Sequence, residues 1–303
     1  MKNKEKNKDE ELIEPINQIN LYGYKKYFDL LTNLYKSKRL PNSILLTGPK
    51  GIGKATFAYH FINSILSENE DKSYLYSDFK INVENSTYNK IINNIHPNFF
   101  LVNNDSKNDQ IKIEQIRLLI KFLNKSTYSK NLKLVLIDNL EYLNLNSNNA
   151  LLKAIEEPSH NTFFILIQDS SFKVFETIKS RCVEFKIHFS ENEKKNIFEN
   201  LLCPYNDKFN EFSIFNNLFY LSPGESLKYF LFLRNLNINT EDDILITIEK
   251  FLDSYLINKN REYLSVSTFL IEKFYNELSF NNDLNINLNF NNCLEILKKI
   301  DYA

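Results

Sequence analysis

The pattern of hydrophobic and polar positions divides the chain into two halves. In the first half, short apolar runs alternate with segments whose apolar residues recur at helical spacing. The apolar runs predict strands at 43–47, 99–102, 134–137, 163–167 and 183–187. The periodic segments predict helices within 24–35, 57–66, 113–123, 150–155 and 175–179. Strands that are apolar on both faces and alternate with helices are typical of a parallel sheet covered on both sides, so this half is predicted to be an α/β domain.

From about residue 189 the strand pattern fades and helical spacing dominates. Helices are predicted at 197–202, 227–236, 244–256, 264–278 and 293–300. The polar segments 68–95 and 281–292 are predicted to be irregular or loop. The resulting division has a disordered leader at 1–14, an α/β domain at 15–188, a small helical domain at 189–236 and a helical C-terminal domain at 237–303.

Composition narrows the class of protein. A chain of 303 residues, 43% of them hydrophobic, can bury several cores, and no apolar run approaches the roughly 20 residues of a membrane span. We therefore expect a cytoplasmic protein without membrane contact. The net charge of −1 lacks the basic excess of an independent DNA-binding protein. Cys182, Cys203 and Cys293 form no CxxC pair, so we expect them to be reduced and buried, without zinc or disulfides.

The strongest local signal lies between the first predicted strand and the following helix. Residues 48–54 read Gly-Pro-Lys-Gly-Ile-Gly-Lys, which fits the phosphate-binding pattern GxxxxGK. Gly48, Gly51 and Gly53 would let backbone N–H groups turn toward phosphate oxygens, and Lys54 would reach the β and γ phosphates. The alternative is a glycine-rich turn that binds nothing.

The residue after the lysine departs from the pattern. Position 55 is Ala, where Ser or Thr would supply the hydroxyl that holds Mg²⁺. Thr56 carries a hydroxyl but would present it from a different angle of the helix. The sequence therefore predicts a weak or vestigial site for ATP or ADP with impaired magnesium coordination, and no protein-ligated metal.

An acid follows the predicted strand 134–137. Asp138 would lie at the carboxyl end of that strand, where ligands bind in open α/β sheets. An apolar strand that ends in Asp is common in proteins. Because a phosphate loop precedes it in the chain, however, Asp138 is a credible candidate for the acid that holds Mg²⁺ through water. In hydrolysing relatives the next residue is a Glu that activates water, whereas this chain has Asn139, which cannot accept that proton. Glu141 is expected to point elsewhere.

A third signal is weak by itself. Arg181 follows the predicted helix 175–179 in the run Ser-Arg-Cys, where an arginine usually caps carbonyls or is solvated. Taken with the loop at 48–56 and with Asn-Asn-Ala-Leu-Leu-Lys-Ala-Ile-Glu-Glu-Pro at 148–158, however, this run resembles bacterial clamp-loader AAA+ subunits of DNA polymerase III. The segments 39–42 and 96–97 fit the same family, and the close resemblance covers about 21–187.

The resemblance implies specific roles. In that family the Ser-Arg-Cys arginine is a finger that enters a neighbour's ATP site, so Arg181 would act in trans. Hydrolysing members have Lys-Ser or Lys-Thr, then Asp-Glu, and a sensor arginine at about the Gly224 position; this chain has Lys-Ala, Asp-Asn and Gly. Loss of these features with Arg181 retained is similar to the delta-prime members, which would make the chain a holoenzyme component without ATPase or polymerase activity of its own.

The same resemblance implies partners. They would be the gamma or tau and delta subunits in a hetero-oligomeric ring, with the sliding clamp and primer-template DNA contacted through the complex. The four zinc-binding cysteines of many members are missing between 68 and 98, and the C-terminal collar domain is short.

Two alternatives remain. One is a catalytic gamma or tau type ATPase that uses Lys54, Thr56, Asp138 and Glu141. The other is a small-molecule kinase or an unrelated P-loop protein, which leaves the runs at 148–158 and 180–182 unexplained.

Overall fold

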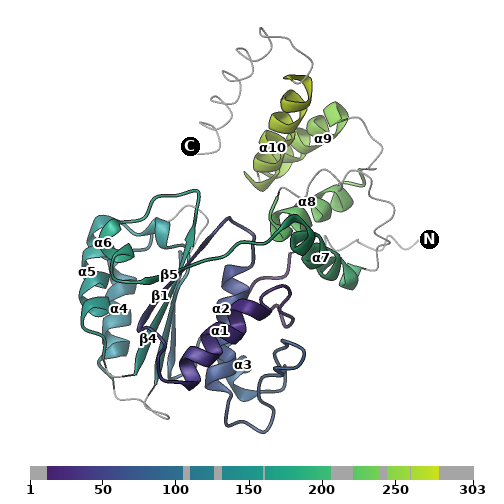
Figure 1. The fold of residues 1–303 in the computed structure, drawn as a ribbon. Coiled ribbons are helices and arrows are strands. Elements are labelled where there is room, and N and C mark those ends of the chain that lie inside the picture. Colours follow the sequence, from purple (N-terminus) through teal and green to yellow (C-terminus); the bar gives the residue numbers. More distant parts are fainter. Residues whose placement is uncertain are drawn as a thin grey trace, which may run out of the picture. The chain divides into compact units, whose positions relative to one another are not determined.

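The computed structural model describes residues 12–104, 110–125, 132–159, 161–205, 221–238, 244–259 and 261–279 (Figure 1). They form two compact units. The larger contains the described residues from 13 to 205 and from 221 to 225, and the smaller contains Leu12 and the described residues from Ser226 onward. The predicted loop 281–292, the predicted helix 293–300 and most of the leader 1–14 lie outside the described residues. The predicted domain boundaries at 188 and 236 stay a prediction.

Five parallel strands form the centre of the larger unit, as the sequence predicted. They are β1 (Ser43–Gly48), β2 (Phe99–Val102), β3 (Lys133–Ile137), β4 (Thr162–Asp169) and β5 (Val183–Lys186). The strand order is β2-β3-β4-β1-β5, and every neighbouring pair is parallel. Every residue of β1 and β3 is buried, because helices cover both faces of the sheet.

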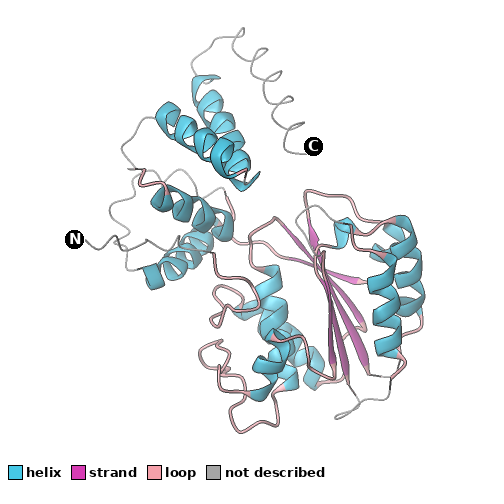
Figure 2. Cartoon of the chain, turned by 180° about the vertical axis from the view of Figure 1, so that it is seen from behind, coloured by secondary structure: helices cyan, strands magenta, loops and turns pink. Residues whose placement is uncertain are grey.

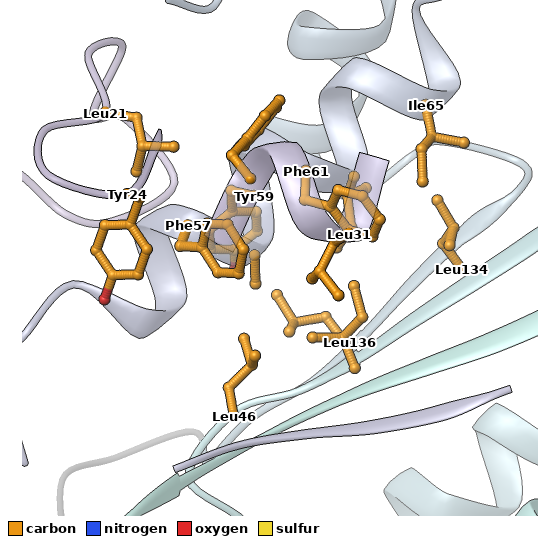
Figure 3. Close-up of a cluster of buried hydrophobic side chains, with 14 of the residues drawn as sticks. Leu21, Tyr24, Leu31, Leu46, Phe57, Tyr59, Phe61, Ile65, Leu134 and Leu136 are labelled. Atoms are coloured by element: carbon orange, nitrogen blue, oxygen red, sulfur yellow. The ribbon is translucent and has the colours of Figure 1, made fainter. Parts of the chain in front are cut away.

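One helical layer contains α1 (Lys25–Lys36), α2 (Lys54–Leu66) and α3 (Ser86–Ile92), and the other contains α4 (Ile113–Leu123), α5 (Leu145–Glu156) and α6 (Glu176–Lys179) (Figures 1 and 2). Successive side chains of a strand point to opposite faces. Leu134 and Leu136 of β3 therefore join the cluster under α1 and α2, whereas Val135 and Ile137 join the cluster under α4 and α5. Figure 3 shows the first cluster, in which Phe57 and Phe61 of α2 and Leu31 of α1 gather over strand residues Leu46, Leu134 and Leu136.

The structure corrects two predictions of local structure. Helix α3 lies in the segment 68–95 that the sequence predicted to be irregular. It begins where the side chain of Asn85 accepts a hydrogen bond from the N–H of Tyr88, and it buries Tyr88 and Ile91. Helix α5 begins at Leu145, five residues before the predicted pattern, because Asn144 caps its first turn.

One prediction about the cysteines is wrong. Cys203 is exposed, while Cys182 is partly buried, and both are free thiols. Burial raises the pKa of Cys182 to about 11. Cys293 lies outside the described residues.

Helices make up the rest of the described chain. Helix α7 (Glu191–Leu202) belongs to the larger unit, α8 (Pro223–Asn235) begins there, and α9 (Ile244–Asn258) and α10 (Arg261–Ser279) belong to the smaller unit. Short 3₁₀ turns span Leu140–Tyr142 (η1) and Cys203–Tyr205 (η2). In the smaller unit, Phe251 stacks on Tyr229 with ring centroids 6.1 Å apart. Within the described ranges, none of the helices has both the length and the apolar character needed to cross a membrane.

Candidate functional site

The predicted phosphate loop leaves the carboxyl end of β1 at Gly48 and ends at Lys54, the first residue of α2. Gly51 and Gly53 have φ angles of +72° and +100°, which residues with a Cβ rarely adopt. A Cβ on Gly53 would also lie 3.2 Å from the ring of Tyr24. The backbone thus has the glycine-dependent path of a phosphate cradle, followed by a helix whose positive end faces the loop.

Lys54 spans this loop. Its Nζ donates to the carbonyl oxygens of Gly48 at 2.7 Å and of Pro49 at 2.8 Å. Burial lowers the pKa of Lys54, and the negative charges of Asp169, Glu141 and Asp138 oppose that change. Because an ammonium group has three donors, one remains for a phosphate oxygen while the loop contacts persist.

Tyr24 packs against the phosphate loop, a contact that the sequence did not predict. Its hydroxyl donates to the carbonyl oxygen of Ile52 at 3.0 Å, and its ring stacks on Phe57 with centroids 4.8 Å apart. The side chain is almost fully buried, and burial raises its pKa. Tyr24 therefore holds the outer turn of the loop against α2.

The start of α8 packs against the same loop within the larger unit. The N–H of Gly224 donates to the carbonyl oxygen of Gly51 at 2.9 Å. A Cβ on Gly224 would lie 2.6 Å from that oxygen, so the backbones approach too closely for any side chain. The position at which the family resemblance implies a sensor arginine in active members has no room for one in this arrangement.

Asp138 lies directly after β3, at the carboxyl edge of the sheet, as predicted. Burial raises the pKa of its carboxyl group, while the N–H of Asn139 and the charge of Lys54 lower it. The structure thus brings Asp138 and the phosphate loop to one edge of the sheet, although they are more than 80 residues apart in sequence.

Asn139 is turned toward another loop. Its backbone is left-handed, with φ +58°, a conformation that Asn tolerates better than most residues. Its Nδ2 donates to the Oδ1 of Asn104 at 3.0 Å. The amide at the position of the water-activating acid therefore has a structural partner.

The position of the Glu141 side chain differs from the sequence prediction. The prediction that it points elsewhere is wrong, because η1 returns the chain toward β4. The N–H of Asp169 donates to Oε2 of Glu141 at 3.3 Å. Burial raises the pKa of Glu141, and so do the negative charges of Asp169 and Asp138. The hydrogen bonds from backbone N–H groups lower it. One cluster thus contains Lys54, Asp138, Glu141 and Asp169, the last of which the sequence did not indicate.

The residues present fit a phosphate better than a fully ligated magnesium ion. The methyl group of Ala55 packs against the hydrophobic cluster under α1 and α2, and Thr56 lies in the first turn of the same helix. Across the part of the chain that the structure describes, no three His, Cys, Asp or Glu side chains are arranged to hold a metal ion. The cradle could hold phosphate oxygens through backbone N–H groups and Lys54, whereas the methyl group of Ala55 offers no ligand to a magnesium ion.

Arg181 lies in the turn between α6 and β5. Its Nη1 donates to the carbonyl oxygen of Thr177 at 2.8 Å, and its Nη2 lies 2.5 Å from Oε1 of Glu156. Its side chain is 38% exposed. The expected capping of a helix carbonyl is confirmed, and it coexists with an ion pair that the sequence did not predict.

The strand register separates Arg181 from the phosphate loop. Strands β1 and β5 are parallel, and Val183 at the start of β5 is paired with Ile44 near the start of β1. The loop begins at Gly48, four residues and about 13 Å further along β1. Arg181 precedes Val183, so it belongs to the amino edge of the sheet, whereas the loop, Asp138 and Glu141 belong to the carboxyl edge.

The strand order, the loop after β1 and the acid after β3 define an AAA+ P-loop domain. Comparison with known proteins specifies the family. The model of the family "DNA polymerase III, delta subunit" matches residues 23–191. The chain belongs to this family of clamp-loader subunits, which includes delta-prime, gamma and tau proteins.

Two curated relatives agree with this assignment. The chain is 32% identical to the DNA polymerase III subunit delta' of Pseudomonas aeruginosa over 143 residues, 47% of this chain and 42% of the relative. It is 29% identical to the gamma subunit of Buchnera aphidicola subsp. Schizaphis graminum over 192 residues, 63% of this chain and 50% of the relative. The chain spans about half the length of these curated relatives. A gamma subunit-related protein of Thermotoga maritima, of known structure, is 15% identical, with 90% of this chain and 92% of that one covered and a TM-score of 0.43.

Proposed function

We propose that this chain is a delta-prime type clamp-loader subunit that completes a neighbouring subunit's nucleotide site with Arg181 and does not hydrolyse ATP itself. The observation that carries the proposal is the position of Arg181. It lies at the amino edge of the sheet, beyond reach of the phosphates that its own loop would hold. An exposed arginine there is placed to contact a phosphate that lies outside its own nucleotide site, as in a neighbouring subunit. The planar, permanently charged guanidinium suits that role, because it can bridge phosphate oxygens and stabilise the charge that develops in phosphoryl transfer.

The chain's own site supports the non-hydrolytic part of the proposal. Ala55 offers no hydroxyl to magnesium, and the amide of Asn139 cannot accept a proton from water and is bonded to Asn104. Lys54 and the loop N–H groups can still bind phosphate. We therefore propose that ATP or ADP binds weakly, without turnover.

The partners follow from the same proposal. Gamma or tau and delta subunits would form a hetero-oligomeric ring with this chain, with the helices from 237 onward as its collar segment. Contact with the sliding clamp and primer-template DNA would occur through the complex, which suits a net charge of −1. Such a subunit would act in the cytoplasm.

The alternative of a catalytic gamma or tau type ATPase is favoured by one observation. Glu141 lies in the cluster with Lys54 and Asp138, rather than pointing away. A carboxylate there could in principle take over proton transfer from the missing acid. We rank this alternative second because Ala55 and Asn139 both remain unsuited to hydrolysis.

Reconstitution of the loader with its partner subunits, clamp and primed DNA tests the proposal. Replacing Arg181 by Ala should lower the ATPase rate of the complex while the ring still assembles. Lys54→Ala in this chain should leave that rate unchanged, since the loop of this chain contributes no turnover. An unchanged rate with Arg181→Ala would refute the finger. A rate that falls with both Lys54→Ala and Glu141→Gln would instead establish the ATPase alternative.

A further inference from the structure

Glu156 and Arg181 form an ion pair between two helix ends on one face of the sheet. Glu156 is the last residue of α5, and Arg181 follows α6. Oε1 of Glu156 lies 2.5 Å from Nη2 of Arg181, while the carbonyl oxygen of Thr177 accepts from Nη1 at 2.8 Å. Two different guanidinium nitrogens are thus anchored. Because the group is planar, two such anchors restrict its orientation as well as its position.

Glu156 and Thr177, the two residues that hold the guanidinium group, each lie next to a buried side chain. Ile155, next to Glu156, and Ile178, next to Thr177, belong to the hydrophobic cluster under α4 and α5. A weak polar contact also joins the two helices, since Nδ2 of Asn148 lies 3.5 Å from Oγ1 of Thr177. The carboxylate of Glu156 is therefore presented from a helix whose position relative to α6 is held by core packing.

The pair remains accessible, with 38% of the Arg181 side chain and 43% of the Glu156 side chain exposed. A solvent-facing arginine without a partner samples many rotamers and loses that freedom when it engages a phosphate. An arginine already held in one orientation loses less. Nη1 also donates to Oγ of Ser180 at 3.4 Å, so these contacts leave the N–H of Nε and one N–H of Nη2 for a phosphate.

We propose that Glu156 is a positioning residue for Arg181: it holds the guanidinium in the orientation in which it enters a neighbouring nucleotide site. This inference rests on the proposed trans action of Arg181. It adds a role for the acidic end of α5, which no contact with the chain's own phosphate loop explains. Glu157 supplies a matched control, because it is also exposed and adjacent in sequence.

The test compares variants in the reconstituted loader with clamp and primed DNA. Glu156→Ala should lower the kcat for ATP about two- to fivefold, the range expected for an exposed ion pair. kcat and kcat/KM should fall together, because the lost interaction acts in the transition state. Glu156→Gln, whose amide oxygen can still accept from Nη2, should lose less than Glu156→Ala. Glu157→Ala should behave as the unmodified protein.

A double variant separates positioning from a structural role. If Glu156 acts through Arg181, adding Glu156→Ala to Arg181→Ala should lower the rate no further. Ring assembly, followed by size-exclusion chromatography, should be equal for all variants. An unchanged or increased rate with Glu156→Ala would overturn the positioning role, as would a further loss in the double variant. If Arg181→Ala alone had no effect, the proposed finger itself would fail, which distinguishes the two failures.

Discussion

His60 of α2 should make the stability of the larger unit depend on pH. The residue is fully buried, with Nδ1 2.9 Å from the hydroxyl of Tyr74 and Nε2 2.9 Å from the carbonyl oxygen of Gln18. A carbonyl oxygen only accepts, so we assign the ring proton to Nε2, while Nδ1 accepts from Tyr74. The neutral ring satisfies both contacts. A charged ring would be isolated from water, and burial accordingly lowers the pKa of His60 to about 4.

The magnitude follows from the difference between folded and unfolded states. An unfolded chain gives His60 a pKa of about 6.5, and the folded chain about 4. Because the folded pKa is depressed, the contribution to stability is complete above pH 6.5 and is lost as the pH falls toward 4. The loss should reach about 2 kcal/mol at pH 5 and about 3 kcal/mol in total.

Urea unfolding of the full chain near pH 7 and pH 5, followed by far-UV circular dichroism, measures this loss. His60→Gln removes the titrating group, so its decrease in unfolding free energy between the two pH values should be about 2 kcal/mol smaller than that of the unmodified chain. His188→Gln, at an exposed histidine, should follow the unmodified chain. Equal losses in the unmodified chain and His60→Gln would refute the reasoning.

Three further predictions concern the loop and the sheet. Lys133→Met should lower the free energy of unfolding by about 1–3 kcal/mol in urea titrations, because Nζ of Lys133 donates to two carbonyl oxygens at the end of α4. The control Lys121→Met, at an exposed lysine, should change the free energy of unfolding by less than about 0.5 kcal/mol. Gly224→Ala should lower the Tm, since its Cβ would meet the carbonyl oxygen of Gly51 at 2.6 Å; an unchanged Tm would mean that this contact can open freely. Ala55→Ser should strengthen binding of ATP with Mg²⁺ but not of ADP with EDTA, as measured by calorimetry; equal affinities for both proteins would contradict the assignment of the missing hydroxyl.

The sheet was predictable because its signal is local. A strand buried on both faces needs apolar residues at every position, and β1 and β3 meet that requirement. Helix α3 escaped prediction because it has only seven residues and lies in a region rich in Asn, where the cap at Asn85 does not stand out.

The residues of the candidate site likewise divide into those that the sequence predicted and those that it did not. The phosphate loop, Asp138 and Arg181 were found because each belongs to a short run with defined spacing. The position of Glu141 could not be predicted from β3, because the left-handed backbone of Asn139 and the turn of η1 redirect the chain after the strand. Tyr24 acts through a hydrogen bond to a residue 28 positions away, a contact that no local pattern encodes.

On the proposed function, the register of β1 and β5 explains how a subunit could lose ATP hydrolysis and keep its arginine finger. The phosphate loop, Asp138 and Glu141 occupy the carboxyl edge of the sheet, whereas Arg181 and its contacts occupy the amino edge. No side chain is shared between the two sets. Substitutions at the carboxyl edge can therefore abolish hydrolysis without disturbing the anchors of Arg181, provided that the replacements satisfy the fold. Ala55 does so by packing against the core, and Asn139 does so through Asn104. On the proposed function, the substituted site and the intact finger are compatible because they are separate structures on one sheet.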